Sequence, residues 1–229
     1  MNDLIKGELE VIEQFIRSDS IVFDVGGCQG EWSGEVLKRG LAKCVHVFEP
    51  VQTSYNQIFK NLQMYEDKVV LNLLAASDTQ RSDVFWEYVS HPTLSTKYKR
   101  NEQVMLHFGI QNPTQIEVET ISLDTYCMKN SISHIDFLKI DVEGAELDVL
   151  QGACELLSTG RIKHLQFEYG GCFLDAGITL KMIYDFLSSK RYKIGIMLNG
   201  IVQYLSCFDI EMENYEYCNY VGVYDGLLI

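Results

Sequence analysis

The chain has 229 residues, 47% of them hydrophobic and 22% charged, and its 32 acidic and 19 basic residues give a formal net charge of −13. We expect a single α/β domain over residues 1–229, because this length suffices for one sizeable core. Such a composition is typical of globular proteins and excludes a disordered chain. The negative charge argues against a nucleic-acid partner, because phosphate binding relies on clustered Lys and Arg.

The seven cysteines are scattered along the chain without a C-x-x-C pair. This usage indicates reduced, mostly buried thiols and therefore a reducing compartment. The first residues lack the apolar core of a signal peptide, and no apolar run approaches the ~18 residues of a membrane span. We therefore expect a cytoplasmic protein that does not contact membranes.

The chain opens with an expected N-terminal helix in residues 1–18, because apolar side chains between 3 and 17 fall on one helical stripe. Strand and helix patterns then alternate, which predicts a parallel sheet with right-handed crossovers. The expected strands and helices of this part are 21–25, 31–39, 44–48, 51–63 and 69–75.

Residues 79–119 break this alternation and contain an aromatic and basic stretch. We predict that they form an insertion over the ligand edge of the sheet, a substrate lid. Beyond it the expected elements are a strand at 116–121, a helix at 122–128, a strand at 134–141, a helix at 145–157, a strand at 162–167 and a helix at 180–190.

The last part of the chain is all-β, with strands at 194–198, 201–205 and 217–224 and a tight turn at Asn199-Gly200. The predicted fold is a Rossmann-like α/β domain with a seven-stranded, mostly parallel sheet. Helices cover both of its faces, and an antiparallel hairpin forms its C-terminal edge.

A glycine turn after the first strand and a carboxylate after the second indicate a site for an adenosine-containing cofactor. The turn reads Asp24-x-Gly26-x-x-x-Gly30, and Glu49 follows the second strand. Glycines let the backbone approach a ligand, and a carboxylate can accept hydrogen bonds from a ribose diol. Two simpler interpretations remain open: a tight turn alone, and Glu49 as a cap of the helix after Pro50.

The glycine spacing favours one cofactor over another. A dinucleotide loop reads G-x-G-x-x-G and holds a pyrophosphate, which Asp24 would repel. The ammonium of a methionine-like tail would instead pair with Asp24. The loop resembles motif I of class I S-adenosylmethionine-dependent methyltransferases. The candidate cofactor-binding residues are Asp24, Gly26, Gly27, Gln29, Gly30 and Glu49, with Ala76 and Ser77 either contacting the adenine or forming a solvated turn.

A longer stretch resembles the FkbM family of methyltransferases. It comprises Ser122-Leu123-Asp124, the run from Lys139 to Glu146 and Leu150-Gln151-Gly152-Ala153. With the glycine loop, the resemblance spans roughly residues 20 to 170. It implies a Rossmann-like fold, S-adenosylmethionine as the methyl donor and methylation of a hydroxyl oxygen, often on a sugar. Gly27-Cys28 departs from the Ala-Asn frequent in the family, and the last 50 or so residues carry no signature.

Acidic residues follow two neighbouring strands at the ligand edge. The candidate catalytic residues are Asp141, Glu143 and Glu168. Acids also gather at helix N-termini as caps, which is the simpler interpretation. One of them can act as general base on a substrate hydroxyl, or Asp141 and Glu168 can hold a divalent cation, which is the less favoured alternative.

Four residues of the expected lid are candidate substrate-binding residues: His91, Lys97, Tyr98 and Arg100. Aromatic faces and fixed donors suit sugars, whereas the alternative is a solvated loop. The overall prediction is an S-adenosylmethionine-dependent O-methyltransferase acting on a carbohydrate or a glycosylated small molecule. The alternatives are an NAD-dependent oxidoreductase and a non-catalytic cofactor-binding regulatory module.

Overall fold

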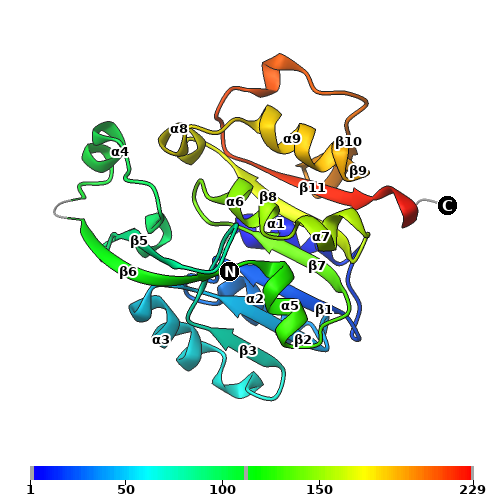
Figure 1. Cartoon of the computed structure of the whole chain (residues 1–229), viewed down its shortest axis with the longest axis horizontal. Helices are drawn as coiled ribbons and strands as arrows, with labels where there is room; N and C mark the ends of the chain where they lie inside the picture. Colours follow the sequence, from blue (N-terminus) through cyan, green and yellow to red (C-terminus); the bar gives the residue numbers. More distant parts are fainter. Residues whose placement is uncertain (1–2, 111–112, 228–229) are drawn as a thin grey trace.

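The main sheet has eight strands in the order β10-β9-β11-β8-β7-β1-β2-β3 (Figure 1). The computed structural model describes residues 3–110 and 113–227. The strands from β3 to β8 along this order are parallel, and β9, β10 and β11 pair antiparallel with their neighbours. Their bounds are β1 Ile21–Val25, β2 Cys44–Phe48, β3 Val69–Asn72, β7 Ile135–Ile140, β8 Ile162–Tyr169, β9 Tyr192–Leu198, β10 Ile201–Tyr204 and β11 Cys218–Tyr224.

The Rossmann-like α/β fold is therefore confirmed, but the predicted number of seven strands is wrong. The eighth strand is β10, which the Asn199-Gly200 turn folds back onto β9. Both turn residues have positive φ, 51° and 78°, as a tight two-residue hairpin turn requires. The predicted strand 69–75 is also too long. Its last residue belongs to β4, Ala75–Ala76, which pairs with another strand outside the main sheet.

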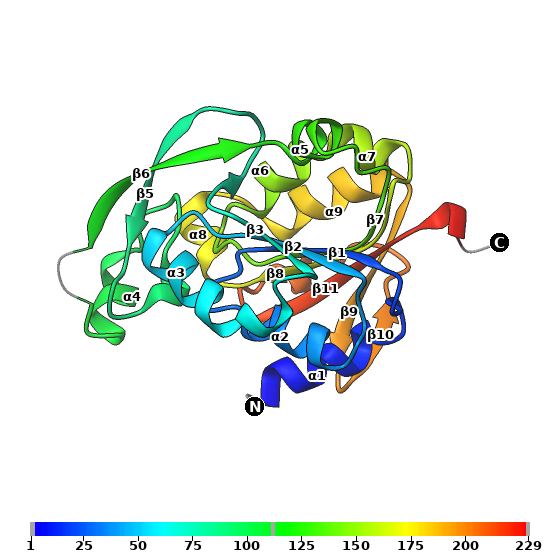
Figure 2. The same ribbon diagram turned by 90° about the horizontal axis from the view of Figure 1, so that it is seen from below.

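Helices cover both faces of the sheet, and each layer has its own core (Figure 2). One layer contains α1 Asp3–Ile12, α2 Glu31–Lys38 and α3 Gln52–Asn61. The other contains α5 Leu123–Lys129, α6 Glu146–Gln151, α7 Cys154–Ser158 and α9 Leu180–Ser189. Alternate residues of β1 serve the two cores, because Val22 packs with the first layer and Phe23 with the second.

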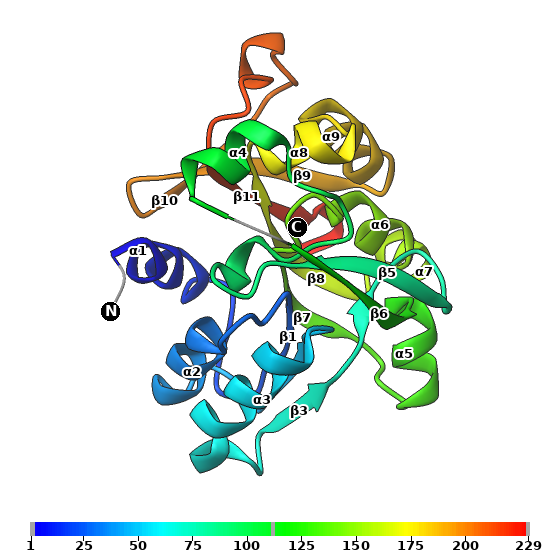
Figure 3. The same cartoon turned by 90° about the vertical axis from the view of Figure 1, so that its left-hand side faces the viewer.

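The insertion is more regular than its sequence indicates. Strand β6, Thr114–Ile121, pairs antiparallel with β5, Ser82–Glu87, and parallel with β4, so the three form a second sheet. Between β5 and β6 lie a short 3-10 turn and the helix α4, Glu102–His107. Figure 3 shows the insertion in front of the end of the main sheet where the parallel strands finish.

The predicted helix 145–157 is two helices, because α6 ends at Gln151 and α7 begins at Cys154. Gly152 between them lies against the chain just after β4: a Cβ there would sit 1.9 Å from the backbone oxygen of Ser77. The break therefore lets the chain after β4 pass close to the helix layer. In the described ranges, no helix has the length and apolar character needed to cross a membrane.

We expect Gly152→Ala to destabilise the fold, because both sides of the contact are backbone and cannot rotate away. Overpacking of this kind costs about 1–3 kcal/mol or more, which for a domain of this size lowers Tm by about 2–4 °C per kcal/mol. Gly171→Ala is the matched control, because nothing lies within 4 Å of its added Cβ. Thermal unfolding followed by circular dichroism measures both variants; equal Tm values would contradict the tight contact.

Candidate functional site

A cavity of about 740 Å³ opens at the carboxyl ends of β1, β2, β7 and β8. Its walls come from the glycine loop after β1 (residues 24–30), the acidic loop after β7 (residues 141–145) and part of the insertion. Open α/β sheets bind ligands at this edge. Among the predicted cofactor-binding residues, Asp24, Gly26, Gly27, Gln29, Glu49 and Ala76 line the cavity.

The glycine loop is packed too closely for side chains. A Cβ on Gly26 would lie 1.8 Å from the backbone oxygen of Asp141, and one on Gly27 would lie 2.4 Å from a methyl of Val47. Gly26 also has a φ of 90°, which L side chains rarely adopt. The amides of Gly26 and Gly27 both donate to the carbonyl of Phe48. Gly26 and Gly27 therefore contribute only backbone atoms to the cavity wall.

Glu49 joins the two loops that follow β1 and β2. Its carboxylate accepts hydrogen bonds from the backbone N–H of Cys28 at 2.9 Å and of Val51 at 2.8 Å. Burial raises the pKa of Glu49 to about 7. The predicted capping role is thus present in the structure, and the same side chain lines the cavity. A cap and a ligand contact do not exclude each other, because each carboxylate oxygen has two lone pairs.

Asp24, Lys139 and Asp141 form a buried charged row across β1 and β7. The ammonium of Lys139 lies 2.8 Å from Asp141 and 3.8 Å from Asp24. Burial alone would lower the pKa of Lys139, but the charges of Asp141 and Asp24 outweigh it and raise that pKa. Burial raises the pKa of Asp24, although the charge of Lys139 and the hydrogen bond from Ser33 oppose the shift.

One carboxylate oxygen of Asp24 accepts no hydrogen bond from the described residues. Oδ2 accepts from the hydroxyl of Ser33 at 2.6 Å, whereas Oδ1 has no hydrogen-bond partner among the described residues, although Asp24 is only 1% exposed. The Lys139 ammonium lies 3.8 Å from Oδ1, too far for a hydrogen bond, and a buried oxygen without one is costly and rare. The atom belongs to a residue of the cavity wall, which makes it a candidate contact for a cationic ligand group.

The three predicted catalytic acids lie together. One carboxylate oxygen each from Asp141, Glu143 and Glu168 fits within 4.8 Å of the others. Burial raises the pKa of Glu143 to about 7, although Arg100 opposes the shift. Burial, and then the charges of Asp141 and Glu143, raise the pKa of Glu168 well above its usual range. The cluster therefore combines an ammonium-paired carboxylate with two carboxyls whose pKa values are raised by burial and by neighbouring acids.

Glu146 stabilises the acidic loop through two hydrogen bonds from the loop backbone. It is fully buried, and its carboxylate accepts from the backbone N–H of Val142 at 3.1 Å and of Gly144 at 2.9 Å. Burial raises the pKa of Glu146 to about 8. Glu143, between its two bonded neighbours, has a φ of 58°. Glu146 thus holds a loop in which a non-glycine residue adopts a left-handed conformation.

Two predicted cofactor-binding residues lie outside the cavity lining. Ser77 is buried, its amide donates to the carbonyl of Ile121, and its hydroxyl donates to Asp78. The amide of Gly30 donates to the carbonyl of Gly27 and so closes the turn. Ala76, beside Ser77, is the residue of this pair that reaches the cavity.

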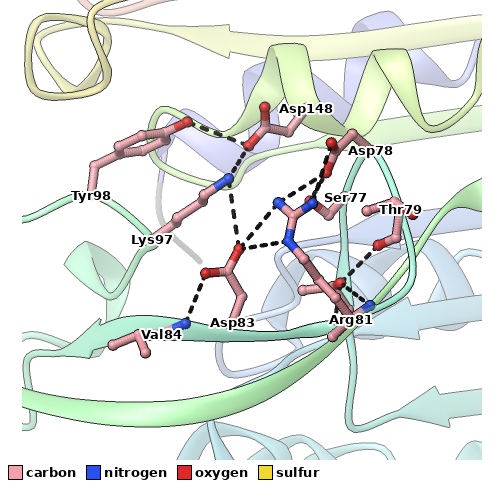
Figure 4. A network of polar contacts seen from close by, with 10 residues as sticks. Ser77, Asp78, Thr79, Arg81, Asp83, Val84, Lys97, Tyr98 and Asp148 are labelled. Carbon is pink, nitrogen blue, oxygen red and sulfur yellow. Dashed lines mark hydrogen bonds and ion pairs between the residues drawn. The ribbon is translucent and has the colours of Figure 1, made fainter.

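None of the four predicted substrate-binding residues lines the cavity. Lys97 and Tyr98 point to Asp148 of α6, at 2.7 Å and 3.3 Å, in a polar network that joins the insertion to the helix layer (Figure 4). His91 lies beside Ser90, with 3.0 Å between the ring Nδ1 and the hydroxyl. The insertion reaches the cavity through other residues instead: Phe85, Pro92, Thr93, Ser95 and Phe108.

Arg100 is 3% exposed and pairs with Glu143 and with Asp175. Thr96, which is also buried, donates its hydroxyl to the carbonyls of Val142 and Glu143 at 3.1 Å and 2.9 Å. The segment 96–100 is therefore a strap fixed to the acidic loop. Contact of these residues with an acceptor stays a prediction.

The cavity wall includes residues that the sequence analysis did not select: Glu8 of α1, Trp32 of α2 and Tyr217 just before β11. Glu8 carried no signal, because it is one acid in an acidic helix. Trp32 follows the glycine loop by two residues, and that proximity could have identified it. Tyr217 lies far along the chain and reaches the site only through the antiparallel pairing of β11 with β8.

Residues 24–194 match the methyltransferase FkbM domain. The chain belongs to the FkbM methyltransferase family. The chain is 34% identical over 196 residues to the 2-O-methyltransferase NoeI of Sinorhizobium fredii, with 81% of this chain and 78% of that protein covered. The AMB antimetabolite synthetase AmbE of Pseudomonas aeruginosa is 27% identical over 161 residues, which are 58% of this chain and 8% of AmbE.

Among solved structures, the methyltransferase FkbM of Methylobacillus flagellatus superimposes with a TM-score of 0.55 and 16% identity. The match covers 90% of this chain and 44% of that chain. At this identity the likeness shows the fold, which agrees with the parallel core of the main sheet. This chain thus spans less than half the length of the solved FkbM structure and a small part of AmbE.

We expect Glu146→Gln to change how stability depends on pH. The folded pKa of Glu146 is raised from 4.5 to about 8, so its contribution to stability is full below about pH 4.5 and is lost as pH rises to about 8. Glutamine does not titrate. The free energy of unfolding of the wild type minus that of the variant should therefore fall by on the order of 3–5 kcal/mol from pH 4.5 to 8.

Urea unfolding at pH 5, 6.5 and 8 measures this difference. Glu155→Gln is the control, because Glu155 is exposed and its variant should follow the wild type at every pH. A constant difference between the wild type and Glu146→Gln across the three pH values would refute the titration of Glu146 in this range.

Proposed function

We propose that this FkbM protein is an S-adenosylmethionine-dependent O-methyltransferase whose acceptor is a hydroxyl of a carbohydrate or a glycosylated small molecule. The observation that carries the cofactor assignment is the buried oxygen of Asp24, which accepts no hydrogen bond and has only the Lys139 ammonium 3.8 Å away, beside glycines without room for side chains. A cation next to that oxygen would favour the ionised carboxylate. The cofactor has such a cation in its amino group, whereas a dinucleotide would bring a pyrophosphate.

The residues present fit this cofactor along one line of the cavity. Asp24 would take the ammonium group, Gly26 and Gly27 would let the backbone approach the tail, and Glu49 would accept hydrogen bonds from the ribose hydroxyls. Ala76 would lie against the adenine. When bound, S-adenosylmethionine supplies an electrophilic methyl group on its sulfonium. What the protein must add is an acceptor oxygen held in line and relieved of its proton.

Glu168 is the acid best suited to take that proton. A general base works best with a pKa near the working pH, and burial together with Asp141 and Glu143 raises the pKa of Glu168. Asp141 is paired with the ammonium of Lys139 at 2.8 Å. Asp141 would therefore orient the acceptor and tune Glu168. The name of the relative NoeI, a 2-O-methyltransferase, supports a hydroxyl oxygen as the acceptor atom.

The first test concerns the cofactor. S-adenosylhomocysteine should bind the purified protein in calorimetry, and NAD should not. Glu49→Gln should weaken that binding by about 10–150-fold, the equivalent of about 1.5–3 kcal/mol for a hydrogen bond to a charged group. Glu66→Gln is the control, because Glu66 is exposed and outside the cavity lining. NAD binding without any S-adenosylhomocysteine binding would favour the oxidoreductase instead.

The second test concerns the acids. With an acceptor in hand, Glu168→Gln should abolish turnover and leave S-adenosylhomocysteine affinity nearly unchanged. Asp141→Asn should lower turnover and move the acid limb of the pH profile to lower pH, because removal of the Asp141 charge lowers the pKa of Glu168. Full activity of Glu168→Gln would remove it as the base. Loss of wild-type activity on chelator treatment, restored by Mg²⁺, would favour the metal alternative.

A further inference from the structure

A chain of polar side chains joins the two ends of the protein beside the cavity. The Nε2 of Gln166 donates to Asn219 at 3.0 Å, and the Nδ2 of Asn219 donates to Glu8 at 2.9 Å and to the hydroxyl of Tyr217 at 3.2 Å. Glu8 and Tyr217 line the cavity. Glu8, Tyr217 and Asn219 all lie outside residues 24–194, which match the family domain.

Two buried polar atoms next to this chain lack partners among the described residues. The Oε1 of Gln166 accepts no hydrogen bond, and the Nε1 of Trp32 donates none. Gln166 is 1% exposed and Trp32 is 5% exposed, and Trp32 lines the cavity. Gln166 neighbours Lys139 in the sheet register, and Lys139 also lines the cavity. The orphan donor of Trp32 thus belongs to the cavity wall, whereas Gln166 lies outside the lining and beside Lys139 in the sheet; groups of this kind need an explanation.

The charges of the wall restrict what can bind there. Glu8, Asp141, Glu143 and Glu168 all line the cavity, and Lys139 is the one cation among its described lining residues. Lys139 is already paired with Asp141. A phosphate or carboxylate on the acceptor, without the ammonium group that accompanies the carboxylate of S-adenosylmethionine, would therefore meet repulsion and no free cation. An ammonium group would suit the acids, but it has no acceptor for the N–H of Trp32.

A hydroxyl donates and accepts at once, so a neutral polyol can accept from the N–H of Trp32 and bind carboxyls in either protonation state. The rings of Trp32 and Tyr217 add apolar surface for a sugar ring. We propose that Glu8, Trp32 and Tyr217 form the acceptor subsite and that it takes a neutral, hydroxyl-rich acceptor without phosphate or carboxylate groups. This inference rests on the proposed function and narrows its substrate class.

The test uses the full chain saturated with S-adenosylhomocysteine and a panel of methyl glycosides in saturation-transfer NMR. Neutral methyl hexosides, 6-deoxyhexosides and pentosides form one arm. A methyl hexuronide, a hexose 6-phosphate and a methyl aminohexoside form the others. We expect binding in the neutral arm and at least about tenfold weaker binding in the anionic arms. Equal or tighter binding of an anionic probe, or a preference for the amino sugar, would overturn the proposal.

Two variants locate the subsite. Glu8→Gln and Tyr217→Phe should each weaken the best neutral probe by about five- to tenfold and leave S-adenosylhomocysteine affinity unchanged. Tyr217 is 51% exposed, so its variant should fold normally. Glu10→Gln on the same helix is the control. Unchanged probe affinity in both variants contradicts the subsite. Failure of every glycoside with retained S-adenosylhomocysteine binding overturns this inference alone, whereas loss of that binding in the wild type removes the proposed function itself.

Discussion

The buried ammonium of Lys139 is the constraint on which the rest of the site depends. It lies between Asp24 at the end of β1 and Asp141 just beyond β7, and it is nearly inaccessible to water. A charge in that position is stable only while both strands keep their register, because breaking a buried pair leaves an uncompensated charge at a cost of about 3–5 kcal/mol. The same register brings the carbonyl of Asp141 against Gly26. One ion pair thus couples the glycine loop to the acidic loop.

That coupling explains why acids crowd an edge where they repel one another. Lys139 neutralises Asp141, Arg100 neutralises Glu143, and backbone N–H groups hold Glu49 and Glu146. Glu168 receives the least compensation, and the pKa of its carboxyl accordingly rises well above the usual range. The structure therefore gives chemically similar carboxyls different partners and different pKa values through their neighbours, which is how one residue type can serve several roles in a site.

The sequence predicted those parts of the site that depend on local patterns. The order of strands and helices, the glycine loop and the acids after β7 all follow from periodicity and spacing within about 30 residues. Three features were beyond such reasoning. Glu8 and Tyr217 meet through pairing of β11 with β8, which no local pattern specifies. Arg100 was assigned to substrate binding, because its partners Glu143 and Asp175 are 43 and 75 positions away in the sequence. The number of strands in the main sheet was also wrong, although the strand at 201–205 was itself predicted.

The position of Arg100 also changes how the insertion must work. A lid that opens and closes requires weak contacts with the body of the protein, because mobile elements come from the least stable parts of a fold. Arg100 is instead buried against two acids, and Thr96 is bonded to the backbone of the acidic loop. Opening the strap would expose a paired charge and release a strained Glu143. The strap thus sets the shape of the acidic loop, while other residues of the insertion form part of the cavity wall.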